Sequence, residues 1–236
     1  MVQLPKIIAE YAESFRGLLF PNLCMGCSNV LSKNENILCF ICENSLPKTN
    51  FHLETENIIF KRLYGRILIE NATALFYFDK GNTVQRLMHL LKYSNKKEIG
   101  KYLGSMLGKD LLDSELYKNI SSVIPIPLHE KKLKIRGYNQ AEYFALGIAE
   151  AMKINAVTNV LQRIENTETQ TGKNRFERWE NVKDAFVFKN ESTIENHHVL
   201  LVDDVVTTGA TLEACAQHLM TIPNVSVSIV TIAFAH

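Results

Sequence analysis

Hydrophobic residues along the chain occur alternately in short continuous runs and in runs with helical spacing. Runs rich in β-branched and aromatic residues predict strands at 58–69, 72–78, 122–126, 157–161, 199–202 and 225–234. Apolar residues three and four positions apart predict helices at 5–19, 84–91, 99–111, 141–152 and 212–219. Because strands and helices alternate over most of the chain, the pattern predicts an α/β domain with a mostly parallel sheet flanked by helices.

Two polar segments interrupt this pattern. Residues 21 to about 50 are rich in Asn, Ser, Lys and Pro and contain four of the five cysteines. This segment is too small for an apolar core of its own, so a bound metal would supply its stability. Residues 163–183 have no apolar stripe and are unusually long for a connection, which predicts a mobile segment. We therefore expect an N-terminal helix and cysteine module in residues 1–50 and the α/β domain in residues 51–236.

The charges of the chain nearly cancel, with 26 Lys and Arg against 25 Asp and Glu and a formal net charge of +1. This balance excludes a grossly basic nucleic-acid binder, although it leaves room for a local basic patch. A hydrophobic fraction of 46% excludes wholesale disorder. The sequence contains no run of about 18 apolar residues, so no membrane-spanning helix is expected. Glu10 and Glu13 interrupt the first apolar segment, so this segment does not have the pattern of a secretory signal. We expect a cytoplasmic protein whose thiols stay reduced.

The first four cysteines form two pairs, with two residues inside each pair and 11 residues between the pairs: Cys24, Cys27, Cys39 and Cys42. In a reducing compartment this spacing favours a zinc ion bound by four thiolates. Two redox-active pairs, or unpaired thiols, are the alternative. Four thiolates leave no open coordination position, so we expect a structural zinc. The fifth cysteine, Cys215, falls on the apolar stripe of a predicted helix and is expected in the core.

The most informative segment is residues 199–211, in which an apolar strand ends in Asp203 and Asp204 and a loop of Thr and Gly leads into a helix. In parallel sheets, ligands bind beyond the carboxyl ends of the strands. Gly209 permits a turn in which successive N–H groups converge on an anion, and the helix N-terminus adds further donors. Such a loop suits a phosphate monoester, while the carboxylates can accept hydrogen bonds from sugar hydroxyls or lie near Mg²⁺. The alternative is an ordinary strand-to-helix turn with two solvated acids.

A second anion site is predicted in residues 125–141, where a strand ends at two prolines and a helix follows. The intervening loop carries one acid, Glu130, and four cations: Lys131, Lys132, Lys134 and Arg136. Cations beside backbone N–H groups at the carboxyl end of a strand suit a pyrophosphate. The alternative is a solvated basic loop.

Residues 199–211 closely resemble the 5-phosphoribosyl-1-pyrophosphate signature of type I phosphoribosyltransferases. The resemblance implies that the paired acids hold the ribose 2′ and 3′ hydroxyls and that the loop holds the 5′-phosphate. These roles fall on Asp203 and Asp204 and on Thr207, Thr208, Gly209, Ala210 and Thr211. In the same enzymes the loop that corresponds to residues 125–141 holds the pyrophosphate, which implies catalytic roles for Lys132 and Arg136 beside the two acids.

The chain as a whole resembles the ComF family, also called the competence protein F family, in which two such cysteine pairs precede a type I phosphoribosyltransferase domain. Further matching stretches lie at 77–93, 125–141 and 163–186. The resemblance implies that residues 163–183 form a flexible hood that closes over the sugar. It makes Arg175 and Arg178 candidates for neutralising the leaving pyrophosphate. A surface loop whose charges pair with one another is the alternative.

The expected function is therefore to bind phosphoribosyl pyrophosphate with Mg²⁺ and to transfer phosphoribosyl to a nitrogen acceptor, with release of pyrophosphate. The sequence does not identify the acceptor. The family name implies an alternative of another class, a non-catalytic factor in DNA uptake during natural transformation. Its partners would be single-stranded DNA and a DNA-uptake helicase or another DNA-processing protein, and its site would bind a ligand or a 5′-phosphorylated end. Neither function involves a membrane.

Overall fold

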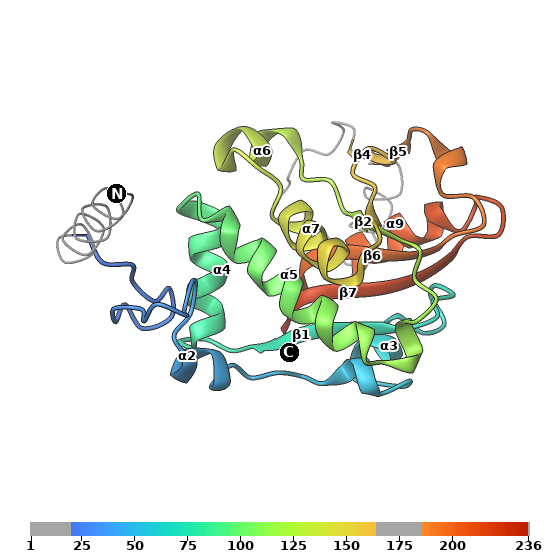
Figure 1. Ribbon diagram of the computed structural model, residues 1–236. Helices are drawn as coiled ribbons and strands as arrows, with labels where there is room; N and C mark the ends of the chain where they lie inside the picture. Colours follow the sequence, from blue (N-terminus) through green and yellow to red (C-terminus); the bar gives the residue numbers. More distant parts are fainter. Residues whose placement is uncertain (1–19, 164–185, 236) are drawn as a thin grey trace, which may run out of the picture. The chain divides into compact units, whose positions relative to one another are not determined.

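The computed structural model describes residues 20–163 and 186–235 of the 236-residue chain (Figure 1). The helix expected at 5–19 lies outside the described residues, and so does all but the first residue of the segment 163–183.

The chain forms two compact units, Met1–Leu46 and Pro47–His236. The second unit begins slightly before residue 50, because the backbone N–H of Tyr77 donates to the carbonyl of Pro47 at 3.0 Å. Residues just before the boundary that the sequence predicts thus already bond to the first strand of the sheet.

The second unit is built on a five-stranded parallel sheet with the strand order β1-β7-β6-β2-β3. Its strands are β1 (Ala72–Phe78), β2 (Ser122–Pro125), β3 (Asn155–Ala156), β6 (His198–Val206) and β7 (Ser226–Ala235). A separate antiparallel pair consists of β4 (Leu161–Arg163) and β5 (Phe186–Phe188). The mostly parallel sheet expected from the sequence is confirmed.

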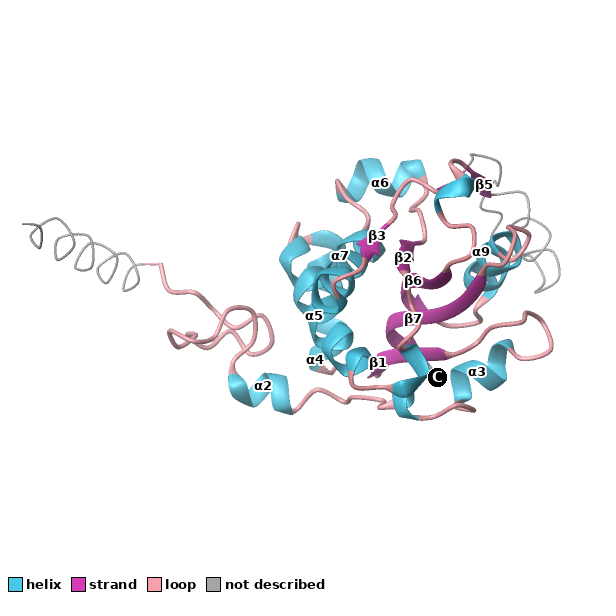
Figure 2. Ribbon diagram, turned by 45° about the vertical axis from the view of Figure 1, so that its right-hand side comes forward, coloured by secondary structure: helices cyan, strands magenta, loops and turns pink. Residues whose placement is uncertain are grey.

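Helices cover both faces of this sheet (Figure 2). The helices of the second unit are α3 (Ile58–Leu63), α4 (Thr83–Tyr93), α5 (Lys97–Leu112), α6 (Glu130–Arg136), α7 (Gln140–Met152) and α9 (Ala210–Leu219). Figure 2 shows α4, α5 and α7 on one side of the sheet and α3 and α9 on the other. Short 3-10 turns lie at η1 (Phe51–Leu53), η2 (Glu115–Tyr117) and η3 (Glu191–Thr193). The first unit contains α2 (Phe40–Asn44).

Two glycines allow α5 and α7 to pack closely. A Cβ atom at Gly104 would lie 2.1 Å from the carbonyl oxygen of Phe144, and one at Gly147 would lie 2.1 Å from the carbonyl oxygen of Lys101. No larger residue fits at either position without a shift of the backbone. On the opposite face of the sheet, the predicted core residue Cys215 is fully buried in α9.

The predicted strand at 58–69 is wrong, because its first part is the helix α3 and residues 64–69 form a turn followed by irregular chain. Asn57 caps the helix, since its side chain accepts hydrogen bonds from the N–H groups of Ile59 and Phe60, each at 3.1 Å. Ile59 and Leu63 lie four residues apart and are both completely buried, which is the spacing of a helix. The β-branched composition of the segment favoured a strand in spite of this cap and this helical spacing.

The predicted strand at 157–161 is also wrong, since residues 157–160 lie between β3 and β4. The N–H of Val157 still donates to the carbonyl of Val123, but the chain then leaves the edge of the sheet to pair with β5. The strand predicted at 199–202 is correct but longer, because β6 continues to Val206. Among the described residues, no helix is long and apolar enough to cross a membrane.

Candidate functional site

The candidate site opens where two neighbouring strands part. β2 ends at Pro125, opposite Val202 of β6, whereas β6 continues beside β7 as far as Val206. The N–H of Ile126 still donates to the carbonyl of Val202 at 2.8 Å, and the two strands part after this bond. Asp203 and Asp204 lie in this last part of β6, inside the strand rather than beyond its end.

A cavity of about 230 Å³ lies beside the acid pair. Its charged lining consists of Asp203 and Asp204 together with Lys92, Lys132, Arg136 and Arg163. Thr211 of α9 and Asn139, the N-cap of α7, also contribute to its wall. The structure therefore brings together both predicted acids, both predicted pyrophosphate cations and one residue of the predicted phosphate loop.

The two acids differ in their electrostatic surroundings. Asp204 forms an ion pair with Lys92, with 2.8 Å between Oδ2 and Nζ. Asp203 accepts a hydrogen bond from the N–H of Asp204 at 2.8 Å. Burial and the neighbouring charge of Asp204 raise the pKa of Asp203 to about 7, although that hydrogen bond and the charges of Lys92 and Arg163 oppose the rise. Asp203 thus titrates near neutral pH in the absence of ligand.

The loop after β6 has the backbone geometry of an anion-binding turn. Gly209 has φ +80°, in the left-handed region, and is the N-cap of α9. Thr207 and Thr208 are exposed, and the Thr208 hydroxyl accepts a hydrogen bond from the N–H of Ala210 at 3.5 Å. Thr211, expected in the loop, lies in the first turn of α9. Residues 207–210 adjoin the cavity in sequence but do not line it.

The predicted basic loop is a short helix, α6, which corrects the sequence-based expectation. His129 caps it through its ring nitrogen Nδ1, which accepts from the N–H of Lys131, and Gly137 ends it with φ +79°. The helix therefore presents its cations on different sides. Lys132 and Arg136 line the cavity, whereas Lys131 and Lys134 do not. Arg136 is oriented by a 2.7 Å hydrogen bond from Nη1 to Oε1 of Gln140 in α7.

Sequence reasoning assigned no role to two cations of the cavity, Lys92 and Arg163. Lys92 lies within the matching stretch 77–93, in the last turn of α4, and no local pattern indicates that it reaches Asp204. The buried Nε of Arg163 has no hydrogen-bond partner among the described residues, which suits an anionic ligand in the cavity. Arg175 and Arg178 lie outside the described residues.

The four predicted zinc ligands lie together in the first unit. Their sulfur atoms all lie within 4.8 Å of one another, and 3.7 Å separates Cys27 Sγ from Cys39 Sγ. Tetrahedral zinc with Zn–S bonds of about 2.3 Å needs sulfur atoms about 3.8 Å apart. Cys24 and Cys42 are buried, whereas Cys27 is exposed. The geometry therefore fits a four-thiolate metal site.

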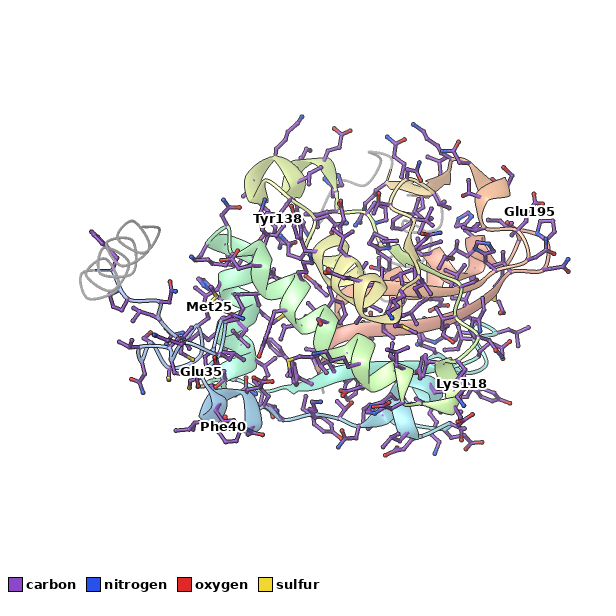
Figure 3. All side chains as sticks on the ribbon, in the orientation of Figure 1. Met25, Glu35, Phe40, Lys118, Tyr138 and Glu195 are labelled. Carbon is purple, nitrogen blue, oxygen red and sulfur yellow. The ribbon has the colours of Figure 1, made fainter. Side chains whose placement is uncertain are left out.

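Backbone N–H groups surround one of these sulfur atoms. Cys24 Sγ accepts hydrogen bonds from the N–H groups of Gly26 at 3.3 Å and Cys39 at 3.2 Å. Burial raises the pKa of the Cys24 thiol, but hydrogen bonds from the backbone of Cys39, Cys27 and Gly26 outweigh it and lower the pKa to about 6. Glu35 fixes the surrounding loop, because its carboxylate accepts from the N–H groups of Ser32 and Phe40, each at 2.7 Å. Figure 3 labels Glu35 and Phe40.

Comparison with protein families identifies the class of the second unit. Residues 141–236 match the family described as Phosphoribosyl transferase domain. This segment includes β6, the acid pair, the loop 207–211 and α9. The parallel sheet and this match make the second unit similar in fold to a phosphoribosyl transferase domain. Among solved structures, the chain is similar to glutamine phosphoribosylpyrophosphate amidotransferase from B. subtilis, with a TM-score of 0.40 and 20% identity, over 61% of this chain and 30% of that chain.

The resemblance to the ComF family is confirmed by relatives that align over most of the chain. Competence protein F of Haemophilus influenzae is 28% identical over 211 residues, which cover 83% of this chain and 90% of that protein. DNA utilization protein YhgH of Escherichia coli (strain K12) is 26% identical over 218 residues, or 86% of this chain and 92% of that protein. Competence protein ComFC of Bacillus subtilis is 26% identical over 200 residues, or 84% and 78%.

Proposed function

We propose that the second unit binds 5-phosphoribosyl-1-pyrophosphate with Mg²⁺ and transfers its phosphoribosyl group to a nitrogen acceptor, with release of pyrophosphate. The observation that carries this proposal is the placement of an acid pair, four cations and a left-handed glycine turn at the carboxyl ends of adjacent parallel strands. Ligands of open parallel sheets bind at this edge. The match to a phosphoribosyl transferase domain supports the same assignment.

In this proposal each part of the ligand meets residues of matching chemistry. The carboxylates of Asp203 and Asp204 accept hydrogen bonds from the two ribose hydroxyls. The N–H groups of residues 207–211 donate to the 5′-phosphate at the start of α9, where the helix dipole also favours an anion. Lys132 and Arg136 bind the pyrophosphate from α6.

Further groups complete the charge balance. Arg163 adds a cation whose Nε lacks another partner among the described residues. Bound Mg²⁺ offsets the charge of the diphosphate, and the carboxylates of Asp203 and Asp204 are the hard oxygen donors that the cavity offers to it. Arg175 and Arg178 are assigned to the leaving pyrophosphate on resemblance alone. The protein acts by positioning and charge stabilisation, without a covalent nucleophile.

A pyrophosphate-release assay tests this function. The purified protein is mixed with phosphoribosyl pyrophosphate, Mg²⁺ and a panel of nitrogen acceptors, with and without single-stranded DNA. We expect release above the spontaneous rate with at least one acceptor, and loss of that release in Asp203→Asn/Asp204→Asn. Release by the double variant at the parental rate would contradict the proposed site.

The names of the relatives favour a second candidate function, a non-catalytic role in DNA uptake or use. Relatives named Competence protein F and DNA utilization protein YhgH align over most of the chain. Lys131 and Lys134 are exposed on α6 and offer contacts to a phosphate backbone beside the cavity. Fluorescence anisotropy with labelled single-stranded DNA distinguishes the two functions. Salt-dependent DNA binding without pyrophosphate release supports the second one, in which a helicase or another DNA-processing protein is a partner.

The first unit is proposed to bind one structural Zn²⁺ through its four cysteines. The supporting observations are the sulfur separations and the N–H groups that donate to Cys24 Sγ, because such donors stabilise a thiolate. Four reduced thiols fit a cytoplasmic location, which we propose for the protein.

A further inference from the structure

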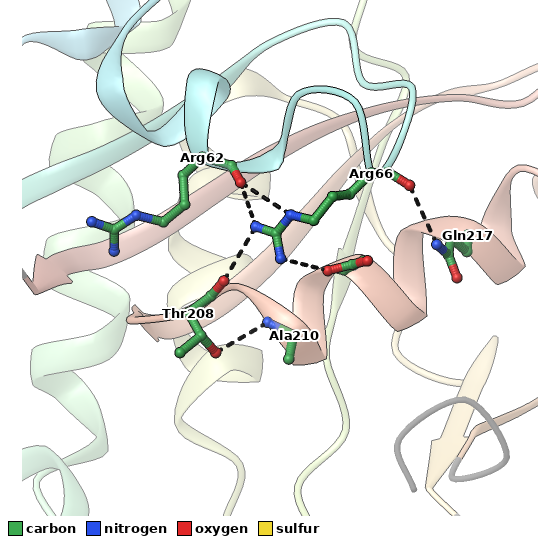
Figure 4. Close-up of polar contacts among 6 residues, drawn as sticks. Arg62, Arg66, Thr208, Ala210 and Gln217 are labelled. Atoms are coloured by element: carbon green, nitrogen blue, oxygen red, sulfur yellow. Dashed lines mark hydrogen bonds and ion pairs between the residues drawn. The ribbon is translucent and has the colours of Figure 1, made fainter. Parts of the chain in front are cut away.

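Two arginines of α3 and the turn after it hold the outer side of the proposed phosphate loop. Arg62 Nη1 donates to the carbonyl oxygen of Thr207, and Arg66 Nη2 donates to that of Thr208 at 3.3 Å. Figure 4 shows the Arg66 guanidinium between the backbone of Thr208 and the first turn of α9. Neither arginine belongs to the cavity lining.

These contacts determine where the amide groups of the loop point. The carbonyl of one residue and the N–H of the next belong to the same planar trans peptide and point in opposite directions. Carbonyls that face the arginines therefore turn the N–H groups of Thr208 and Gly209 away from them. Within the described part of the chain, neither of these N–H groups donates to another group. They are thus available to an anion on the side opposite α3.

Arg66 is itself fixed on several sides. Its Nη1 lies 2.7 Å from Oε2 of Glu213, whose side chain is only 6% exposed in α9. Its Nε donates to the carbonyl of Arg62 at 3.1 Å, and its own carbonyl accepts from Nε2 of Gln217 at 3.4 Å (Figure 4). One planar guanidinium thus joins α3, the loop and α9.

The side chain of Leu63 packs closely against the turn at Gly209. A Cβ atom at Gly209 would lie 2.7 Å from Cδ2 of Leu63, so the turn excludes other residues by space as well as by its positive φ. The loop is therefore held from one side by apolar contact and by hydrogen bonds to its carbonyls.

We infer that Arg66, assisted by Arg62, is a positioning residue that sets the anion-binding conformation of the loop 207–209 for a phosphate monoester. It acts through the loop carbonyls and does not touch the phosphate. This inference rests on the proposed function, which places a 5′-phosphate at this loop.

The test compares ribose 5-phosphate binding by the full chain and three variants in calorimetric titrations. Arg66→Met removes the guanidinium, whereas Arg66→Lys keeps the charge but cannot join Thr208, Glu213 and the Arg62 carbonyl together. Lys61→Met is the matched control, because Lys61 lies in α3 beside Arg62, is 65% exposed and pairs only at 4.0 Å with Glu56. We expect both Arg66 variants to lose about tenfold in affinity, the effect of misplacing one or two hydrogen bonds. The control should stay within about twofold of the parent.

A spectroscopic measurement separates positioning from general destabilisation. In ¹H–¹⁵N spectra the Gly209 amide signal should move downfield when ribose 5-phosphate binds the parent or Lys61→Met, because that N–H donates to the anion. The movement should shrink in both Arg66 variants at saturating ligand.

Each outcome decides a different claim. Parental binding by both Arg66 variants would overturn the positioning role, and parental binding by Arg66→Lys alone would show that only the charge matters, which also overturns it. No binding by the parent would instead contradict the proposed phosphate site. If Arg66→Met does not fold, Arg66→Lys and the amide signal still decide.

Discussion

At the scale of single residues, Asp203 is an acid whose pKa the fold changes strongly. It is half-buried in β6 beside Asp204, so its negative charge is disfavoured while the cavity holds no ligand. Burial and Asp204 raise its pKa from 3.8 to about 7. The proposed ligand site thus lowers the stability of the free protein.

This shift predicts a pH dependence of stability. Folded Asp203 holds its proton up to about pH 7, whereas unfolded Asp203 releases it near pH 4. Between these values the folded state binds more protons, so the free energy of unfolding falls as the pH rises. Asp203→Asn removes this loss and should exceed the parent in stability by roughly 2 to 4 kcal/mol at pH 8. The advantage should be small near pH 4.

Denaturant unfolding of the parent and Asp203→Asn across pH 4 to 8 measures the effect. Asp113→Asn, an exposed acid at the end of α5, serves as the control and should follow the parent. A difference between parent and Asp203→Asn that does not change with pH would contradict the raised pKa.

At the scale of elements, α3 connects the start of the domain to the proposed phosphate loop. Its cap residue Asn57 is 2% exposed and its Nδ2 donates to the carbonyls of Phe51 at 3.2 Å, Glu54 at 3.0 Å and Ala72 at 2.7 Å. The same side chain therefore begins the helix and ties it to η1 and β1. The arginines that hold the loop depend on this placement.

Asn57→Ala should lower the free energy of unfolding by about 2 to 4 kcal/mol, because it removes a cap and leaves buried carbonyls without a donor. Asn82→Ala is the matched control, since Asn82 caps α4 with a single bond from the N–H of Gln85 at 2.9 Å. It should lose only about 1 kcal/mol. Equal losses in both variants, measured by denaturant unfolding, would show that the buried bonds of Asn57 contribute little.

The elements also show what sequence can predict. The strand, the acids and the turn of segment 199–211 could be predicted from the sequence, because these features are local. Prediction from local composition was wrong at 58–69. The composition favoured a strand, but the cap residue Asn57 begins a helix there. Pairs such as Arg66 with Glu213 and Lys92 with Asp204 join residues far apart in the chain, so no local pattern could predict them.

At the scale of the whole molecule, the chain combines a cysteine cluster with a phosphoribosyltransferase-type domain. The cluster lies in a unit with few large buried apolar residues among those described, such as Leu38 and Leu46. Such a small unit needs a metal for stability. The cysteine spacing alone predicts that the four sulfur atoms lie together.

Purified protein should therefore contain close to one zinc per chain by elemental analysis. Cys24→Ser/Cys27→Ser should lose the zinc, because two thiolates no longer complete a tetrahedron. Cys215→Ala is the control, since Cys215 is a buried thiol of α9 outside the cluster, and it should keep the metal. Full zinc retention by the double Ser variant would contradict the four-cysteine site.

In the proposed function the acid pair holds the sugar and the neighbouring loop holds the phosphate. Calorimetric titration of Asp203→Asn/Asp204→Asn with phosphoribosyl pyrophosphate in Mg²⁺, and separately with inorganic phosphate, tests it most directly. We predict a loss of about 1.5 to 3 kcal/mol per charge-assisted hydrogen bond for the first ligand. Phosphate affinity should not fall, because the loop is intact and nearby negative charge is removed. Gly209→Val, which the positive φ and Leu63 both oppose, should weaken both ligands. Parental affinity of the double Asn variant for phosphoribosyl pyrophosphate would show that the two acids do not hold the sugar.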